Sequence, residues 1–184
     1  MKKSLLLLPL FLVACGTAQQ GAGDNPLVKE RYWSELTDRL TSLQIKNDPI
    51  LKDPAKAELV ENLKQDALRR FNDWDTTVRK GISGMFLSAN ELTEGQALLL
   101  DGTLYLGSEF AAYPGPSLHI YLSEVLDPRG KDFSIHTALD LGTLRTPYGD
   151  QSYVLPESQK TKKFRTVILW DTKLGRLYAF AQLA

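Results

Sequence analysis

The stretch of residues 118–123 reads Leu118-His119-Ile120-Tyr121-Leu122-Ser123. Successive side chains of a β-strand point to opposite faces of the sheet, so residues at alternate positions share a face. The three aliphatic residues are therefore expected to face a hydrophobic core, and the other three residues to face the opposite side. The alternation predicts a β-strand that is buried on one face.

Other short segments in the C-terminal part of the chain have the same character. Alternation, or β-branched and aromatic residues, predict strands at 104–106, 166–170 and 177–183. Glycine and proline mark turns between them at Asp101-Gly102, Pro114-Gly115-Pro116, Asp127-Pro128, Tyr148-Gly149 and Leu174-Gly175. Short strands joined by frequent turns predict an all-β domain, a sandwich or a barrel-like sheet, over residues 81–184.

The segment before this domain has helical periodicity. Asn25-Pro26 and Asp53-Pro54 each place an N-cap side chain before a proline, which marks two helix starts. Apolar residues then recur at helical spacing, as Trp33, Leu36, Leu40 and Leu43 in the first helix and Leu59, Leu63, Ala67, Phe71, Trp74 and Val78 in the second. Residues 25–80 are therefore expected to form a helical hairpin, and the fold class is α+β by segment.

The apolar stripe of the second helix has two interpretations. It packs against the first helix and the following domain, which we favour, or it docks into a groove of a partner protein. The other faces of the helix carry charged residues. Glu61 with Lys64 and Asp66 with Arg70 have the spacing of weakly stabilising ion pairs, which indicates a solvated face.

The first fourteen residues predict export. Lys2 and Lys3 precede an apolar run of ten residues from Leu5 to Ala14, whereas a bilayer-spanning helix needs roughly 20. The following stretch, Leu12-Val13-Ala14-Cys15-Gly16, resembles the lipobox of bacterial lipoproteins. The resemblance implies that the signal peptide, residues 1–14, is removed and that Cys15 carries lipid, including palmitate. The alternative is an ordinary secretory signal that happens to end at a cysteine.

A flexible tether is expected to link the anchor to the folded part. Residues 15–24 comprise Cys15 and the stretch GTAQQGAGD, which has little apolar surface to bury. Such a tether spans roughly 17 Å on average. The protein is therefore expected to be exported and held by lipid on the outer or periplasmic side of a bacterial membrane, with its domain near that surface.

Composition excludes several kinds of chemistry. Without residues 1–14 the chain has 20 basic and 22 acidic side chains and no basic patch, so we expect no nucleic-acid partner. Cys15 is the only cysteine in 184 residues. Once it is lipidated, no thiol is left for a disulfide, for thiol redox chemistry or for iron-sulfur ligation. We expect no cofactor.

Few residues are candidates for a site. The candidate ligand-binding residues lie around the 118–123 strand and after the tryptophan of a later strand: Ser117, His119, Tyr121 and Asp171. We favour an ordinary solvated sheet face for this set and for Ser123, which shares the face of His119 and Tyr121. His119 and His136, with Asp140 or Asp171, lack the short spacing of metal ligands, so no metal site is expected. No catalytic residue is assigned, because neither a Gly-x-Ser-x-Gly elbow nor a phosphate-binding loop is present.

A series of short motifs between Gly84 and Leu183 resembles the DM-thirteen domain family, known as an electron-transfer domain of exported and extracellular proteins. The motifs are Gly84-Met85-Phe86, Gly95-Gln96-Ala97, Gly115-Pro116 before the 118–123 strand, Leu139-Asp140-Leu141-Gly142-Thr143-Leu144, Gly149-Asp150-Gln151-Ser152-Tyr153-Val154-Leu155-Pro156, Val167-Ile168-Leu169-Trp170 and Ala179-Phe180-Ala181-Gln182-Leu183. The resemblance implies a β-rich module of about 100 residues. It also implies a redox role that rests on a cysteine directly after the tryptophan.

This chain departs from the family pattern at two positions. Asp171 follows Trp170 where the family has its cysteine, and Ser117 stands where an acidic residue is common. We therefore expect a lipid-anchored envelope protein with a non-catalytic binding or structural module, whose ligand or envelope partner is unknown. The alternative is a redox, electron-transfer or metal-dependent envelope protein, and a hydrolase ranks last.

Overall fold

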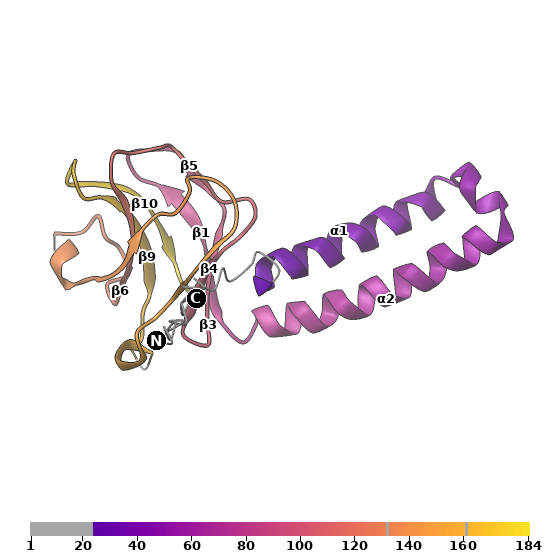
Figure 1. Ribbon diagram of the computed structural model, residues 1–184, viewed down its shortest axis with the longest axis horizontal. Helices are drawn as coiled ribbons and strands as arrows, with labels where there is room; N and C mark the ends of the chain where they lie inside the picture. The colour runs from indigo at the N-terminus through magenta and orange to yellow at the C-terminus, as the bar shows by residue number, and fades with distance from the viewer. Residues whose placement is uncertain (1–23, 132, 161) are drawn as a thin grey trace, which may run out of the picture.

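The computed structural model describes residues 24–131, 133–160 and 162–184. Helix α1 (Pro26–Ile45), the 3-10 turn η2 (Pro49–Lys52) and helix α2 (Pro54–Val78) form a hairpin that projects from a β domain (Figure 1). The expected fold class, two helices followed by a barrel-like all-β part, is confirmed. The expected signal peptide, Cys15 and most of the tether lie outside the described residues. Neither described helix is long and apolar enough to span a bilayer.

The described β part consists of a strongly curled antiparallel sheet and a small two-stranded sheet. The described strands are β1 (Ile82–Ser88), β2 (Thr93–Glu94), β3 (Gln96–Leu100), β4 (Thr103–Leu106), β5 (Ala111–Ala112), β6 (Leu118–Ser123), β7 (Leu139–Thr143), β8 (Gln151–Val154), β9 (Thr166–Asp171) and β10 (Arg176–Gln182). Eight of them follow the order β7-β6-β9-β10-β1-β3-β4-β8, and β2 pairs with β5. The edge strands β7 and β8 are consecutive in the chain, and the sheet curls into a nearly closed barrel (Figure 1).

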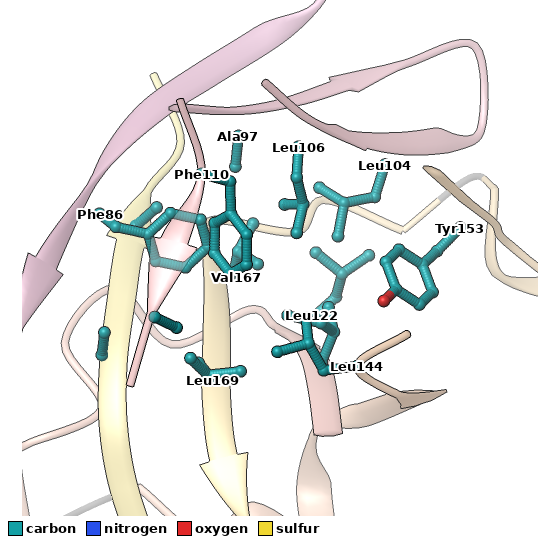
Figure 2. Packing of buried hydrophobic residues seen from close by; sticks show 14 of the residues in the cluster. Phe86, Ala97, Leu104, Leu106, Phe110, Leu122, Leu144, Tyr153, Val167 and Leu169 are labelled. Atoms are coloured by element: carbon teal, nitrogen blue, oxygen red, sulfur yellow. The ribbon is translucent and has the colours of Figure 1, made fainter. Parts of the chain in front are cut away.

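The barrel interior holds the main hydrophobic core. Aliphatic and aromatic side chains from strands around the sheet meet there (Figure 2), among them Phe86, Leu104, Leu106, Phe110, Ile120, Leu122, Val167 and Leu169. The alternating aliphatic residues of β6 all belong to this cluster, as the sequence pattern predicts. Full burial of one such side chain stabilises the fold by about 1.5 to 3 kcal/mol.

The outer face of the barrel is covered where β6, β9 and β10 lie side by side. The long connection from β6 to β7, which includes the 3-10 turn η3 (Ile135–Thr137), folds back over these strands. Its apolar residues pack on a second cluster, whose buried members are Tyr121, Ile168, Leu177 and Phe180. The expectation of a solvated face is therefore wrong for Tyr121 and Ser123, which are 8% and 3% exposed. Tyr121 is covered by apolar side chains of the connection, and the Ser123 hydroxyl accepts a hydrogen bond from the Val125 N–H at its start (3.0 Å).

The base of the helical hairpin packs on the outer face of another part of the sheet. Asn25 caps α1 by accepting a hydrogen bond from the Leu27 N–H (3.1 Å), and its side-chain amide donates to the Leu106 carbonyl (2.7 Å). Leu27 is buried against Leu98 and Leu100 of β3. The N-cap prediction therefore also locates the contact that attaches the hairpin to the barrel.

The buried row of α2 differs from the predicted stripe. Ala67 of the predicted stripe is buried, but Val60 outside the stripe is also buried, and Leu59 and Leu63 are 55% and 46% exposed. Two helices without a third layer bury only a narrow row of side chains, and Leu59 lies about 100° around the helix from Val60. The predicted ion pairs of this helix are present, with Glu61 to Lys64 at 2.7 Å and Asp66 to Arg70 at 2.8 Å.

Candidate functional site

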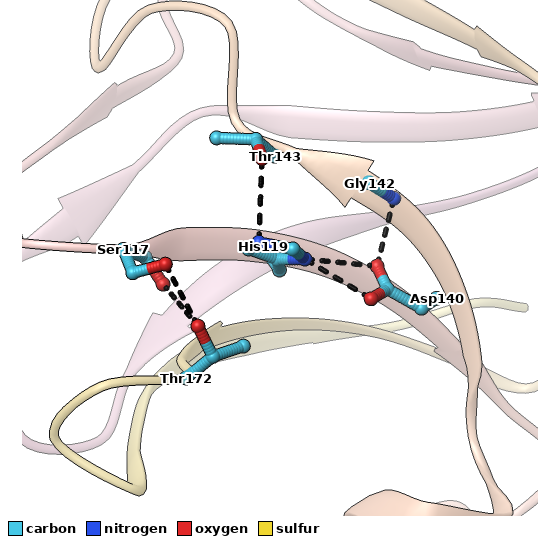
Figure 3. A network of polar contacts seen from close by, with 6 residues as sticks. All are labelled: Ser117, His119, Asp140, Gly142, Thr143 and Thr172. Carbon is cyan, nitrogen blue, oxygen red and sulfur yellow. Dashed lines mark hydrogen bonds and ion pairs between the residues drawn. The ribbon is translucent and has the colours of Figure 1, made fainter.

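His119 is held on the outer face of β6 by side chains of the neighbouring strand β7. Its Nδ1 lies 3.0 and 3.2 Å from the two carboxylate oxygens of Asp140, and its Nε2 lies 3.3 Å from the Thr143 hydroxyl (Figure 3). The Gly142 N–H donates to Asp140 Oδ1 (2.7 Å) and fixes the carboxylate in turn. Both ring nitrogens of His119 are thus engaged, and the ring orientation is set by β7.

Tyr121 lies beside this pair on the same face of the sheet. Its ring stacks with the His119 ring at a centroid distance of 6.1 Å and an interplanar angle of 27°. Burial raises the pKa of the Tyr121 hydroxyl, and the negative charge of Asp140 raises that pKa further. Tyr121 therefore keeps its proton near neutral pH and presents a neutral hydroxyl.

A hollow of about 460 Å³ lies between the η3 turn and the strands beneath it. Its lining residues come from β6, η3, β9 and the turn that follows β9: Tyr121, Ile135, His136, Ala138, Trp170, Thr172 and Gly175. Trp170 is half-buried and lies across from His119 in the β6–β9 pairing. The hollow therefore has aromatic residues of two adjacent strands in its wall.

Asp171 points away from this hollow, into the end of the barrel. In the β6–β9 pairing it lies opposite the buried Leu118, and it is fully buried itself. Its Oδ1 accepts hydrogen bonds from the N–H groups of Lys173 and Leu174 (both 2.9 Å). Its Oδ2 accepts a hydrogen bond from the N–H of Ser117 (3.1 Å). The carboxylate thus caps the turn after β9 and ties it to the start of β6.

The ionisation of Asp171 follows from these bonds. Burial would raise the pKa of the carboxyl group, but the backbone donors and the charge of Lys173 hold the pKa below its usual value. Gly115 and the buried Tyr178 leave little space beside the carboxylate. A Cβ atom added to Gly115 would lie 2.7 Å from Asp171 Oδ2 and 2.6 Å from the Tyr178 hydroxyl.

Ser117 belongs with Asp171 and not with the histidine. Its hydroxyl accepts a hydrogen bond from the Thr172 hydroxyl (2.8 Å), and Figure 3 shows this pair separate from the His119 contacts. The four candidate residues therefore divide into two groups. His119 and Tyr121 lie together on the outer face, whereas Ser117 and Asp171 form a structural junction at the end of the barrel.

The family model described as Electron transfer DM13 matches residues 85–183, from the middle of β1 to just past β10. The match covers more than half of the chain and the barrel except for the first residues of β1. This protein belongs to the electron transfer DM13 family. No curated protein and no solved structure gives a significant match.

The residues of this DM13 domain do not fit a redox group at the position after Trp170. The chain has aspartate there, and its only cysteine is Cys15. The buried carboxylate already accepts three backbone hydrogen bonds. Over residues 24–131, 133–160 and 162–184, no three or more His, Cys, Asp or Glu side chains gather as a metal site would require.

Sequence reasoning missed part of the wall of the hollow. The sequence marks Trp170 only as part of a family motif and His136 only as a distant metal candidate, and it does not mark Thr172. Cross-strand pairing brings Trp170 next to His119, and the fold of the β6–β7 connection brings His136 over the sheet. No local pattern in the sequence marks either arrangement.

Proposed function

We propose that this DM13 protein is a lipid-anchored envelope lipoprotein whose β domain, residues 81–184, is a non-catalytic binding module. The observation that carries the proposal is Asp171. It stands where the resemblance places the redox cysteine, and it is fully buried with three backbone hydrogen bonds. A carboxylate has no accessible one-electron or disulfide chemistry, so this position supports the turn instead of a reaction.

The second candidate function is electron transfer, and membership of the electron transfer DM13 family favours it. In this chain it would need a redox group held away from the position after Trp170. His119 and Asp140 lie 3.0 Å apart and could offer two ligands, but two groups make an incomplete site for a transition metal. We therefore rank the binding module first.

We expect the mature domain to be redox-inactive. Protein lacking residues 1–15 should contain no stoichiometric iron, copper or haem by elemental analysis, and cyclic voltammetry should give no reversible wave. Asp171→Cys serves as the comparison, because only that variant introduces a thiol at the position of the family cysteine. A reversible wave or stoichiometric metal in the unmodified protein would favour electron transfer and overturn the binding proposal.

The proposed anchor makes a separate prediction. Each methylene buried in a bilayer contributes about 0.8 kcal/mol, so two or three acyl chains hold a protein stably. Cys15→Ala removes the attachment point, and we expect the variant in the soluble exported fraction or uncleaved, as judged by fractionation and mass spectrometry. The tether variant Gln19→Ala is the control and should stay with the membrane. A Cys15→Ala protein that is trimmed correctly and remains membrane-bound would show that the lipoprotein proposal is wrong.

A further inference from the structure

The hollow beneath the η3 turn has the size and the aromatic content of a small-ligand site. Its volume of about 460 Å³ falls within the range of roughly 300 to 1,000 Å³ that such sites occupy. Tyr121 and Trp170 lie on the same outer face of two adjacent strands, because Tyr121 pairs with Ile168 and Trp170 pairs with His119. The pairing of β6 and β9 therefore places both aromatic residues.

The charge of the hollow limits what it accepts. Among the described residues, those that line the hollow include no lysine, arginine, aspartate or glutamate, and the Asp140 carboxylate lies beside Tyr121 outside the lining. Nucleotides, phosphates and carboxylic acids would find no cationic side chain in the lining, and an ammonium ligand would find no carboxylate there. The polar side chains of the lining are Tyr121, His136 and Thr172, all of which form hydrogen bonds without a fixed charge. The lining thus suits a neutral ligand with hydrogen-bonding groups.

We infer that the hollow binds a neutral sugar ring. The faces of aromatic rings carry partial negative charge, which attracts the weakly positive C–H groups on one side of a pyranose. The half-buried Trp170 would receive that side, with the buried Tyr121 next to it, and His136 and Thr172 would bond hydroxyl groups at the edge of the sugar. His136 and Thr172 are exposed, so the ring can belong to a free sugar or to a longer glycan.

This inference rests on the proposed binding function and names its ligand class. The test is saturation-transfer NMR on the mature protein in an amine-oxide detergent, which contains no sugar. The probes are glucose, N-acetylglucosamine and the β-1,4-linked trimers of each, with decylubiquinone as a non-sugar probe. We expect transfer to the C–H protons of at least one sugar, and trimers that bind more tightly than their monomers would point to a glycan as the source.

Substitutions test whether the saturation-transfer signal comes from a sugar bound in the hollow. Trp170→Ala and His136→Ala should each weaken sugar binding at least tenfold, whereas Trp170→Phe keeps a flat ring and should retain most of it. Tyr148→Ala removes an aromatic ring that is 58% exposed and absent from the lining, so it should bind like the unmodified protein. Because His136 is exposed, His136→Ala gives a result even if Trp170→Ala fails to fold.

The possible outcomes distinguish failure of the sugar assignment from failure of the proposed binding function. Absence of transfer to every sugar, or equal binding by His136→Ala and the unmodified protein, overturns the sugar assignment. Binding of decylubiquinone alone also overturns that assignment but leaves a binding module in place. A reversible voltammetric wave in the unmodified protein overturns the proposed function itself, whichever probe binds.

Discussion

Replacement of Asp171 by alanine is expected to lower the free energy of unfolding by about 3 kcal/mol. The substitution removes the acceptor of three backbone hydrogen bonds, from Ser117, Lys173 and Leu174, at a fully buried position. Hydrogen bonds to a charged group contribute about 1.5 to 3 kcal/mol each, and their contributions within one cluster overlap. Urea unfolding followed by far-ultraviolet circular dichroism measures the loss.

Asp171→Asn should lower the free energy of unfolding by about half as much as Asp171→Ala. Its remaining oxygen can keep the bonds that Oδ1 accepts from Lys173 and Leu174, while its amide group replaces the oxygen that faces the Ser117 N–H. The control is Asp38→Ala, because Asp38 is exposed on α1 and should change stability by less than about 0.5 kcal/mol. An Asp171→Ala protein as stable as the unmodified one would show that the carboxylate does not support the turn.

The Asp171 carboxylate should also make the free energy of unfolding depend on pH. The pKa of Asp171 in the folded state is lower than its value of about 3.9 in an unfolded chain. The ionised carboxylate therefore stabilises the fold fully at pH values above about 3.9. The stabilisation is lost as the pH falls through the lower pKa of the folded state. The difference in unfolding free energy between the unmodified protein and Asp171→Asn should therefore become smaller as the pH falls below about 4.

Sequence reasoning located the strands that are buried on one face or rich in β-branched residues. The strand predicted at 166–170 is observed as β9, and the strand predicted at 177–183 is observed as β10, with ends that differ by one residue. The alternation in β6 identified its core face correctly. Burial on one face imposes a period of two on the sequence, and such strands can be recognised without a structure.

Strands that lack this pattern were not predicted individually. β3 contains Ala97-Leu98-Leu99-Leu100, a continuous apolar run, because Ala97 faces the barrel core while Leu98 and Leu100 pack against α1. Burial on both faces removes the alternation. The edge strands β7 and β8 are short and partly polar, and their sequences are compatible with loops.

Individual residues of the candidate site could be predicted from the sequence, but their arrangement in space could not. The period-two pattern places His119 and Tyr121 on one face of a strand, and the side chain of Asp140 makes it a possible partner of a histidine. Their packing depends on a bulge in the β6–β7 pairing between Ile120 and Tyr121. The position of His136 depends on how a long connection folds over the sheet. Such long-range placement is set by packing of the whole domain and leaves no local signal.

Gly84 lies where the pairing of β1 changes partner. The first half of the strand pairs with β3, with Gly84 opposite Ala97, and the second half pairs with β10 from Phe86 onward. The end of β10 passes close to β1 at this point, since Ser83 and Ala184 exchange backbone hydrogen bonds of 3.3 and 3.1 Å. A strand that is approached this closely by another backbone favours glycine.

Gly84→Ala is therefore expected to cost at least about 3 kcal/mol of unfolding free energy, or to prevent folding. The added Cβ would lie 2.0 Å from the Gln182 carbonyl oxygen and 2.8 Å from its carbon, and backbone atoms cannot turn aside as a flexible side chain can. The matched control is Gly130→Ala, where the nearest atom is 3.5 Å away and the change should stay within about 0.5 kcal/mol. Urea unfolding and the yield of folded protein test both variants. Equal stability of Gly84→Ala and the unmodified protein would mean that β1 and β10 do not approach each other as closely as described.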